Sequence, residues 1–103
     1  MNALNFIDGV FVDSVDGETL ANVNPATGQE IGTIARSKKV DVEVAAQAAM
    51  RARKDWAALS MLERAEWLDR MADGLEQRKE EIAQRESRDT GKPLALARRV
   101  DAQ

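Results

Sequence analysis

The chain has 103 residues, which is the size of one small domain or of part of a larger one. Lysine and arginine total 15 against 18 aspartate and glutamate, and the two signs are interspersed, which excludes a dominant nucleic-acid-binding face. Cysteine and histidine are absent, which excludes disulfides, thiolate nucleophiles, the commonest general base and the commonest transition-metal ligand. Any catalysis by these residues would depend on carboxylates, lysines or hydroxyls.

The apolar content indicates a globular chain with limited core material. The hydrophobic fraction is 44%, but only 4% of the residues are aromatic and alanine supplies much of the rest, so a self-sufficient core would be marginal. The first residues show neither a basic region nor a following apolar run, and no apolar stretch approaches membrane-spanning length. We therefore expect a soluble cytoplasmic protein.

Residues 5–35 carry the signals of three or four short strands separated by glycine and aspartate. We expect these strands at residues 6–7, 10–12, 20–23 and 30–35. Asp8-Gly9 and Asp16-Gly17 are candidates for turns that require positive φ, and the first is tight enough to join two strands directly. Residues 13–18 superficially resemble a calcium loop, but Val12 stands where the first carboxylate ligand should be, which excludes that site.

A turn is predicted between the last two of these strands, at Asn24-Pro25-Ala26-Thr27-Gly28-Gln29-Glu30. Pro25 fixes its own φ and pushes Asn24 towards extended geometry, while Gly28 can supply a positive φ at little steric cost. Surface connections commonly use these residue types, so a structural turn is favoured over a ligand-binding loop.

From about residue 41 the period of the apolar residues changes from 2 to 3.6, and Asp41 is the expected N-cap of a helix. One face of this helix collects mostly alanine and ends on a large aromatic side chain, at Val42, Ala45, Ala49, Ala52 and Trp56. We expect this face to pack in a core, with Trp56 as its anchor, rather than to bind a cofactor.

A second helix is predicted to start at Ser60-Met61-Leu62-Glu63, which has the residue types of a capping box. Its apolar stripe is widened by Trp67 and Met71 and consists of Leu62, Ala65, Leu68, Ala72 and Leu75. Gly74 interrupts this pattern, and it either permits the close approach of a neighbour or marks a weak point in the helix.

The stretch 76–89 is densely charged, which is typical of a solvated helix. Its main apolar contacts are expected at Ile82 and Ala83, and Glu81 with Arg85 is a candidate ion pair. Because acidic residues offset basic ones almost one for one, the stretch is not a nucleic-acid-binding face.

The segment Asp89-Thr90-Gly91-Lys92-Pro93 is expected to end this helix. Gly91 suits a left-handed helix end, and Pro93 suits the first turn of a following helix at 94–101. A phosphate-binding P-loop is excluded, since Glu86 replaces its first glycine and Pro93 replaces its serine or threonine.

Six short motifs follow one another along nearly the whole chain. They are Phe6-Ile7-Asp8-Gly9, Asn22-Val23-Asn24-Pro25-Ala26-Thr27-Gly28, Ala49 to Trp56, Ser60-Met61-Leu62-Glu63-Arg64, Asp89-Thr90-Gly91-Lys92-Pro93 and Val100-Asp101. Each motif alone is weak, but in this order and spacing they closely resemble the N-terminal region of the aldehyde dehydrogenase superfamily. Residues 86–98 look most similar to members that act on 2-hydroxy- and 2-aminomuconic semialdehydes, with betaine aldehyde dehydrogenases as near relatives.

This resemblance implies an α/β fold in which residues 1–103 are an incomplete, N-terminal part of a Rossmann-like dinucleotide-binding domain, β-rich at 5–35 and helical at 41–103. It implies NAD- or NADP-dependent oxidation of an aldehyde to a carboxylate by the complete enzyme, as a dimer or tetramer. In such enzymes a cysteine thiolate attacks the carbonyl, hydride passes to the nicotinamide, and a glutamate activates the water that releases the acyl group. The family places these groups downstream of Asp101, so we predict no catalytic or cofactor-binding residue here and no activity for these residues alone.

A structural cation is the one functional element that the resemblance implies within these residues. Many members hold Na⁺ or K⁺ near the positions that match Asn22, Val23 and Asp101, largely through backbone carbonyls. Hard cations favour several oxygen ligands, so we expect this site in the complete protein. An ordinary strand end and helix end without an ion is the alternative.

A second class of function is also open, because the chain contains no catalytic group. It could be a free-standing structural or protein-interaction module that binds a partner through its alanine-rich face. The coding sequence after Gln103 separates the two hypotheses, since a continuation that contains cysteine favours the enzyme.

Overall fold

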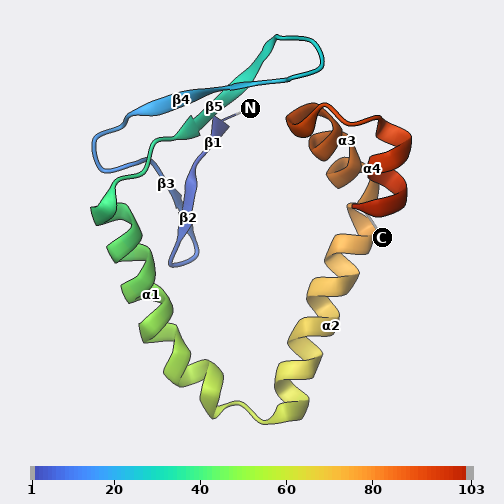
Figure 1. Cartoon of the computed structure of the whole chain (residues 1–103). Helices are drawn as coiled ribbons and strands as arrows, with labels where there is room; N and C mark the ends of the chain where they lie inside the picture. Colours follow the sequence, from blue (N-terminus) through green and yellow to red (C-terminus); the bar gives the residue numbers. More distant parts are fainter. Residues whose placement is uncertain (1, 102–103) are drawn as a thin grey trace. The chain divides into compact units, whose positions relative to one another are not determined.

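The computed structural model describes residues 2–101, which form the mixture of strands and helices that the sequence predicts (Figure 1). In chain order the elements are β1 (Asn2–Ala3), β2 (Asn5–Ile7), β3 (Val10–Val12), β4 (Thr19–Val23), β5 (Glu30–Ala35), α1 (Lys39–Ala58), α2 (Met61–Gln77), α3 (Lys79–Thr90) and α4 (Leu94–Val100). The α/β class is therefore confirmed. None of the helices within the described range is long and apolar enough to span a lipid bilayer.

Two compact units divide the chain. Unit 1 holds the described residues up to Asn22 together with Gly32–Ser60. Unit 2 holds Val23–Ile31 together with the described residues from Met61 onward. The division thus interleaves the β-rich and helical parts of the sequence instead of separating them.

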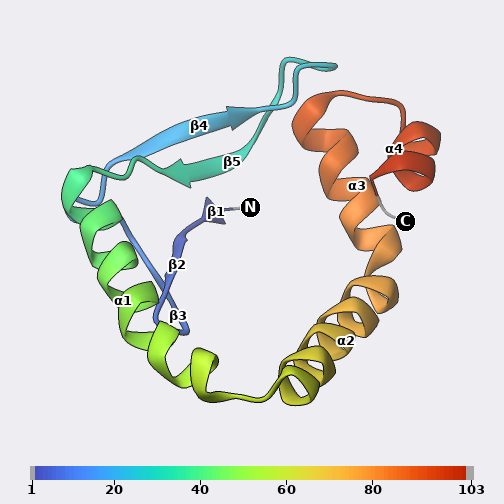
Figure 2. The same ribbon diagram turned by 60° about the horizontal axis from the view of Figure 1, so that its bottom comes forward.

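A three-stranded sheet has the order β1-β5-β4, and β4 and β5 run in opposite directions on either side of the predicted turn (Figure 2). Strand β1 was not expected from the sequence, because two residues are too few to show a period. It pairs parallel to β5, with Asn2 opposite Thr33 and Ala3 opposite Ile34. The Thr33 hydroxyl also donates to Oδ1 of Asn2 at 3.0 Å, so a non-local partner stabilises this strand.

The β2–β3 hairpin confirms the tight turn predicted at Asp8-Gly9. Asp8 has φ 54° and Gly9 has φ 81°, the signs that a two-residue turn between twisted strands requires. Phe6 lies opposite Phe11 in the antiparallel register, and their ring centroids are 4.9 Å apart. This aromatic pair stabilises the hairpin although both side chains are exposed.

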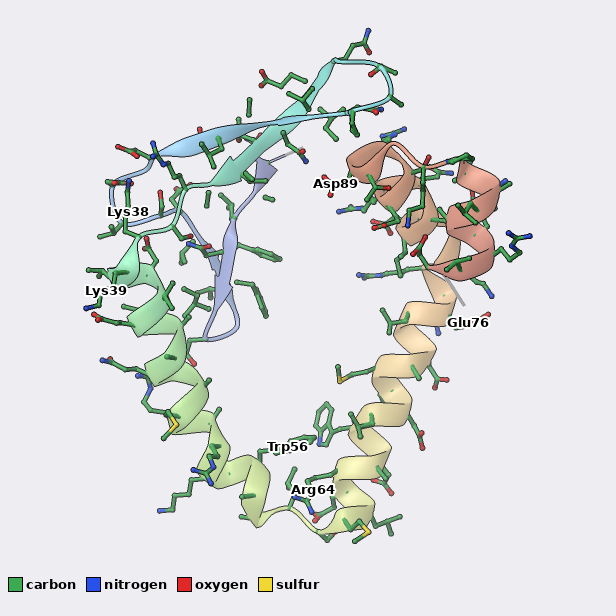
Figure 3. All side chains as sticks on the ribbon, in the orientation of Figure 1. Lys38, Lys39, Trp56, Arg64, Glu76 and Asp89 are labelled. Carbon is green, nitrogen blue, oxygen red and sulfur yellow. The ribbon has the colours of Figure 1, made fainter. Side chains whose placement is uncertain are left out.

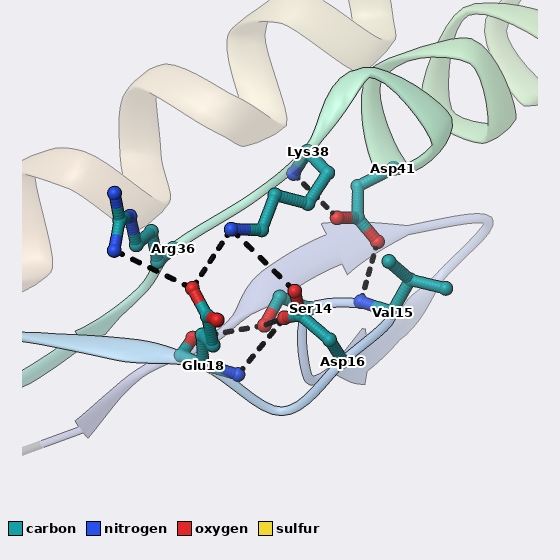
Figure 4. Close-up of polar contacts among 7 residues, drawn as sticks. All are labelled: Ser14, Val15, Asp16, Glu18, Arg36, Lys38 and Asp41. Carbon is teal, nitrogen blue, oxygen red and sulfur yellow. Dashed lines mark hydrogen bonds and ion pairs between the residues drawn. The ribbon is translucent and has the colours of Figure 1, made fainter.

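The start of α1 differs from the sequence prediction. The helix begins at Lys39 and its N-cap is Lys38, so Asp41 is the third helical residue and not the N-cap. The Asp41 carboxylate nevertheless caps the helix from this position, because Oδ2 accepts the backbone N–H of Lys38 at 2.7 Å. Its Oδ1 accepts the backbone N–H of Val15 at 2.8 Å, which joins the turn after β3 to the helix (Figure 4).

The predicted apolar face of α1 is only partly correct. Among the predicted residues Ala45 is half-buried on the side where α1 contacts β2, whereas Ala48, which is buried there, was not part of the predicted face. In contrast, Val42 is 63% exposed and Trp56, near the end of the helix in Figure 3, is 43% exposed. A 20-residue helix is too long for a three-residue strand to cover, so Trp56 is no core anchor within the described residues.

Helix α2 begins at Met61, as the capping-box motif predicts, but it buries no side chain among the described residues. Its predicted stripe of Leu62, Leu68 and Leu75 is exposed. A Cβ added to Gly74 would meet no described atom within 4 Å, so close packing does not explain this glycine here. The helix instead ends one turn later, and a turn at Arg78 separates it from α3.

Helices α3 and α4 lie side by side and form the core of unit 2 (Figure 1). Ala83 and Ala97 are completely buried between them, with Ile82 and Leu94 packed around this pair. The expected apolar contacts at Ile82 and Ala83 are thus confirmed. The predicted ion pair between Glu81 and Arg85 within α3 is also confirmed, at 2.7 Å.

A two-point ion pair also links these helices. The Arg98 guanidinium donates to both carboxylate oxygens of Glu80, at 2.7 and 2.8 Å. The hydrogen bonds from Arg98, with a further bond from Gln84, lower the pKa of Glu80 from its ordinary value of 4.5 to about 2. The planar guanidinium fits a carboxylate in this way and fixes the helix pair in one register.

Replacing Asp41 with alanine is expected to lower the free energy of unfolding by about 1–3 kcal/mol, because two backbone N–H groups lose a charged acceptor. Hydrogen exchange of the Val15 and Lys38 amides should accelerate most. Asp55→Ala in the exposed part of α1 is the control and should change stability by less than about 0.5 kcal/mol. Equal effects of the two substitutions would contradict the bridging role of Asp41.

The Glu80–Arg98 ion pair predicts a pH dependence at the acid end of the range. Because folding lowers the pKa of Glu80, its contribution is fully present above pH 4.5 and is lost as the pH falls through about 2. An NMR titration of the Glu80 carboxyl carbon should show this low midpoint in the wild type. In Arg98→Gln the midpoint should return towards the ordinary value, whereas Arg99→Gln should leave it unchanged.

Candidate functional site

The loop between α3 and α4 is the most highly organised segment of unit 2. Gly91 ends α3 with φ 74°, and its N–H donates to the Ser87 carbonyl at 3.0 Å, which confirms the predicted left-handed helix end. The Ser87 hydroxyl donates to the Lys92 carbonyl at 2.7 Å. Pro93 stands immediately before the first residue of α4. These bonds fix the direction in which the chain leaves α3.

Lys92, in this loop, joins two carboxylates, one from within α3 and one that directly follows α4. Its Nζ lies 2.7 Å from Oδ2 of Asp101 and 3.0 Å from Oε1 of Glu86, and we call these three residues the Lys92 clamp. The hydrogen bond to Asp101, followed by that to Glu86, raises the pKa of Lys92. An ammonium group held in its charged form is neither a nucleophile nor a general base, so the clamp is structural.

The Asn24–Gly28 turn packs against the same loop. A Cβ on Gly91 would stand 2.9 Å from Cγ of Pro25 and 3.2 Å from the backbone nitrogen of Ala26. Within the turn, Gly28 has φ 71° and its N–H donates to the Asn24 carbonyl at 2.8 Å. Oδ1 of Asn24 accepts the Ala26 N–H at 2.9 Å, so this side chain serves the turn, as the sequence predicts.

The three residues predicted to bind a cation lie at element ends. Asn22 and Val23 are the last two residues of β4, and Asp101 directly follows α4. Asn22 belongs to unit 1, whereas Val23 and Asp101 belong to unit 2. The Asp101 carboxylate is engaged by Lys92, which leaves carbonyl oxygens as the candidate ligands. The cation site therefore stays a prediction.

A second polar network surrounds the Asp16-Gly17 turn in unit 1 (Figure 4). Lys38 Nζ lies 2.7 Å from Glu18 and 3.5 Å from Asp16, and Arg36 lies 3.4 Å from Glu18. The Glu18 backbone N–H and then the nearby Lys38 lower the pKa of Asp16. The buried Ser14 hydroxyl donates to the Glu18 carbonyl at 2.8 Å and also lies 3.3 Å from Oδ1 of Asp16, so both contacts hold it within the turn. This network holds the turn in place.

Neither network resembles a metal or catalytic centre. Within residues 2–101, no group of three or more acidic, histidine or cysteine side chains is arranged to hold a metal ion. An apolar cavity of about 330 Å³ in unit 1 is lined by the β2–β3 hairpin and by alanines of α1. It carries Asp8 as its one ionisable wall residue, and that carboxylate is paired with Arg51 at 3.5 Å.

Comparison with known proteins decides the family. Residues 11–103 match the aldehyde dehydrogenase family. The chain belongs to the aldehyde dehydrogenase family. It is 45% identical over 98 residues to the 2-hydroxymuconic semialdehyde dehydrogenase of Pseudomonas sp. (strain CF600), covering 94% of this chain and 20% of that protein. The resemblance to the aldehyde dehydrogenase family is thereby confirmed, and a 2-hydroxymuconic semialdehyde dehydrogenase is among the similar proteins.

Solved aldehyde dehydrogenase structures contain the same arrangement of elements. PnpE from Pseudomonas sp. WBC-3 matches with a TM-score of 0.94 at 42% identity, over 99% of this chain and 21% of that one. The NAD-dependent aldehyde dehydrogenase of Sinorhizobium meliloti matches with a TM-score of 0.90 at 35% identity, over 95% and 20% of the two chains. This aldehyde dehydrogenase chain therefore spans about a fifth of the length of its relatives.

Gly91→Ala is expected to destabilise unit 2 by about 1–3 kcal/mol, because a Cβ there is strained by the positive φ and collides with the Pro25 ring. Gly74→Ala is a matched control, since it adds the same methyl group to an open helix interior and should stabilise α2 by about 0.5–1 kcal/mol. Urea unfolding of both variants measures the difference. Destabilisation of the same size at both glycines would show that the Pro25 contact is unimportant.

Proposed function

We propose that the complete protein containing this chain oxidises a semialdehyde of the muconic type to its carboxylate and passes the hydride to NAD. The observation that carries this proposal is the 45% identity over 98 residues to a 2-hydroxymuconic semialdehyde dehydrogenase. NAD is favoured over NADP because PnpE, whose structure in complex with NAD matches this chain at 42% identity, spans 99% of it.

In this proposal residues 1–103 contribute scaffold and no reacting group. The family reaction needs a thiolate nucleophile, and the chain contains no cysteine. The two lysines at the centres of the polar networks described above, Lys38 and Lys92, are both held in ion pairs that keep them charged. The nucleophile, the general base and the oxyanion-binding groups would therefore come from other parts of the protein.

The residues of this chain do not fit a dinucleotide site either. A pyrophosphate is typically bound where a glycine-rich turn leads from a strand into a helix N-terminus. The junction from β5 to α1 lacks glycine at its turn, and the Asp41 carboxylate already accepts the amide of Lys38, the N-cap of the helix. A second carboxylate-like charge would be repelled there, so we assign NAD binding to another part of the protein.

The uncovered apolar surface supports the proposal that residues 1–103 are an incomplete part of a larger domain. Helix α2 exposes a leucine-rich stripe together with Trp67 and Met71, which are 50% and 62% exposed. An isolated helix of 17 residues is marginal in water without tertiary packing. We propose that the remaining dehydrogenase polypeptide covers this stripe, and that the complete enzyme is a homo-oligomer.

Purified complete protein should reduce NAD in the presence of 2-hydroxymuconic semialdehyde, measured by NADH absorbance. The kcat/KM for this substrate should exceed that for a simple aliphatic aldehyde by about tenfold or more, because a site built for the carboxylate at the far end of the substrate loses binding energy without it. NADP should be a poorer acceptor. Residues 1–103 alone should give no turnover.

Two outcomes would contradict the proposal. Turnover by the 103-residue chain would show that the reacting groups lie within it. An equal preference for the aliphatic aldehyde would retain aldehyde oxidation but remove the semialdehyde assignment.

The predicted cation site is tested by thermal unfolding of the complete protein. Replacing sodium and potassium with choline removes the ion, and its loss should lower the thermal unfolding temperature.

A further inference from the structure

The Lys92 clamp (Glu86, Lys92 and Asp101) brings two carboxylates together at a position that demands a cation. Asp101 stands at the C-terminal end of α4, where the helix dipole disfavours negative charge. Glu86 lies in α3 and its carboxylate approaches the same ammonium group. All three side chains are largely shielded, with 26% to 33% of their surface exposed, so solvent screens their charges only partly.

The ammonium group of Lys92 takes the place that a free cation would occupy between these carboxylates. Its Nζ is 2.7 Å from Asp101 and 3.0 Å from Glu86, both within direct charge-assisted hydrogen-bonding distance. The Lys92 backbone carbonyl is itself fixed by the Ser87 hydroxyl at 2.7 Å, which anchors the lysine at the base of its side chain.

The Asp101 side chain therefore does not fit the role of ligand to a free Na⁺ or K⁺. A monovalent ion would have to compete with an ammonium that the chain itself carries, and a tethered group has the higher effective concentration. Backbone carbonyls are not subject to this competition. The conflict concerns the Asp101 carboxylate alone.

We propose that Lys92 is a built-in cation that holds the ends of α3 and α4 together and excludes metal ions from the Asp101 and Glu86 carboxylates. Removing the ammonium group would leave two partly shielded carboxylates facing one another. Such a pair, together with nearby carbonyl oxygens, is the kind of ligand set that Ca²⁺ prefers. Lys92 would thus keep these two carboxylates free of metal ions. This inference does not rest on the proposed enzymatic reaction.

The test compares the complete wild-type protein with Lys92→Met, which keeps the length of the side chain and removes its charge. Hydrogen exchange of the α4 amides is measured in choline, sodium, potassium and calcium chlorides at equal ionic strength. Wild-type protection should not respond to Ca²⁺. Lys92→Met should lose about tenfold in α4 protection in choline, because two like charges are left unpaired, and Ca²⁺ should restore it.

Lys79→Met is the matched control, since Lys79 forms an exposed ion pair with Glu76 at 3.6 Å and should show no response to calcium. A triple change to Lys92→Met with Glu86→Gln and Asp101→Asn should regain protection without any metal ion and lose the calcium response. The inference would be overturned by calcium-dependent protection of α4 in the wild type. It would also be overturned if Lys92→Met kept its α4 protection in choline, or lost it without recovery in Ca²⁺.

Aldehyde oxidation is measured independently of the hydrogen exchange of the α4 amides. Wild-type protein that fails to oxidise aldehydes but shows the predicted exchange pattern would contradict only the proposed function. Active enzyme whose wild-type α4 protection depends on calcium would contradict only the role of Lys92.

Discussion

Among the described residues, alanine is the only residue type in the fully buried apolar core. Ala48 is buried in unit 1, and Ala83 and Ala97 are completely buried in unit 2, whereas no large side chain reaches full burial among the described residues. Apolar burial stabilises in proportion to area, and an alanine methyl group contributes only a small fraction of what a leucine contributes. Small residues let backbones approach closely, so this core fixes distances between elements more than it supplies free energy.

Polar contacts therefore fix much of the local geometry within each unit. The Asp41 carboxylate accepts hydrogen bonds from two backbone amides in separate segments. Arg98 donates to both carboxylate oxygens of Glu80, and Lys92 forms ion pairs with two carboxylates. Each of these contacts joins segments that are separated in sequence and lie within one unit. Each also engages the charged groups that form it.

Features governed by neighbouring residues could be predicted from the sequence. The turns at Asp8-Gly9 and Asn24–Gly28, and the helix end at Gly91, each depend on backbone conformations that few residue types adopt, so their positions follow directly from residue identity. Features that depend on a distant partner could not be predicted in this way. Strand β1 exists because β5 pairs with it, and Asp41 acts at the third helical position because Val15 also requires its carboxylate.

The same distinction explains the candidate site. Gly91 was recognised as a helix terminator, but its second requirement, room for the Pro25 ring, comes from residues more than sixty positions away and leaves no local signal. The motifs that identify the family, at Asn24–Gly28 and Asp89–Pro93, are therefore two sides of one packing contact in unit 2. A contact that accepts no Cβ on one side and needs a fixed φ on the other constrains both segments together. That shared steric requirement accounts physically for the diagnostic value of these motifs, although neither contains a catalytic group.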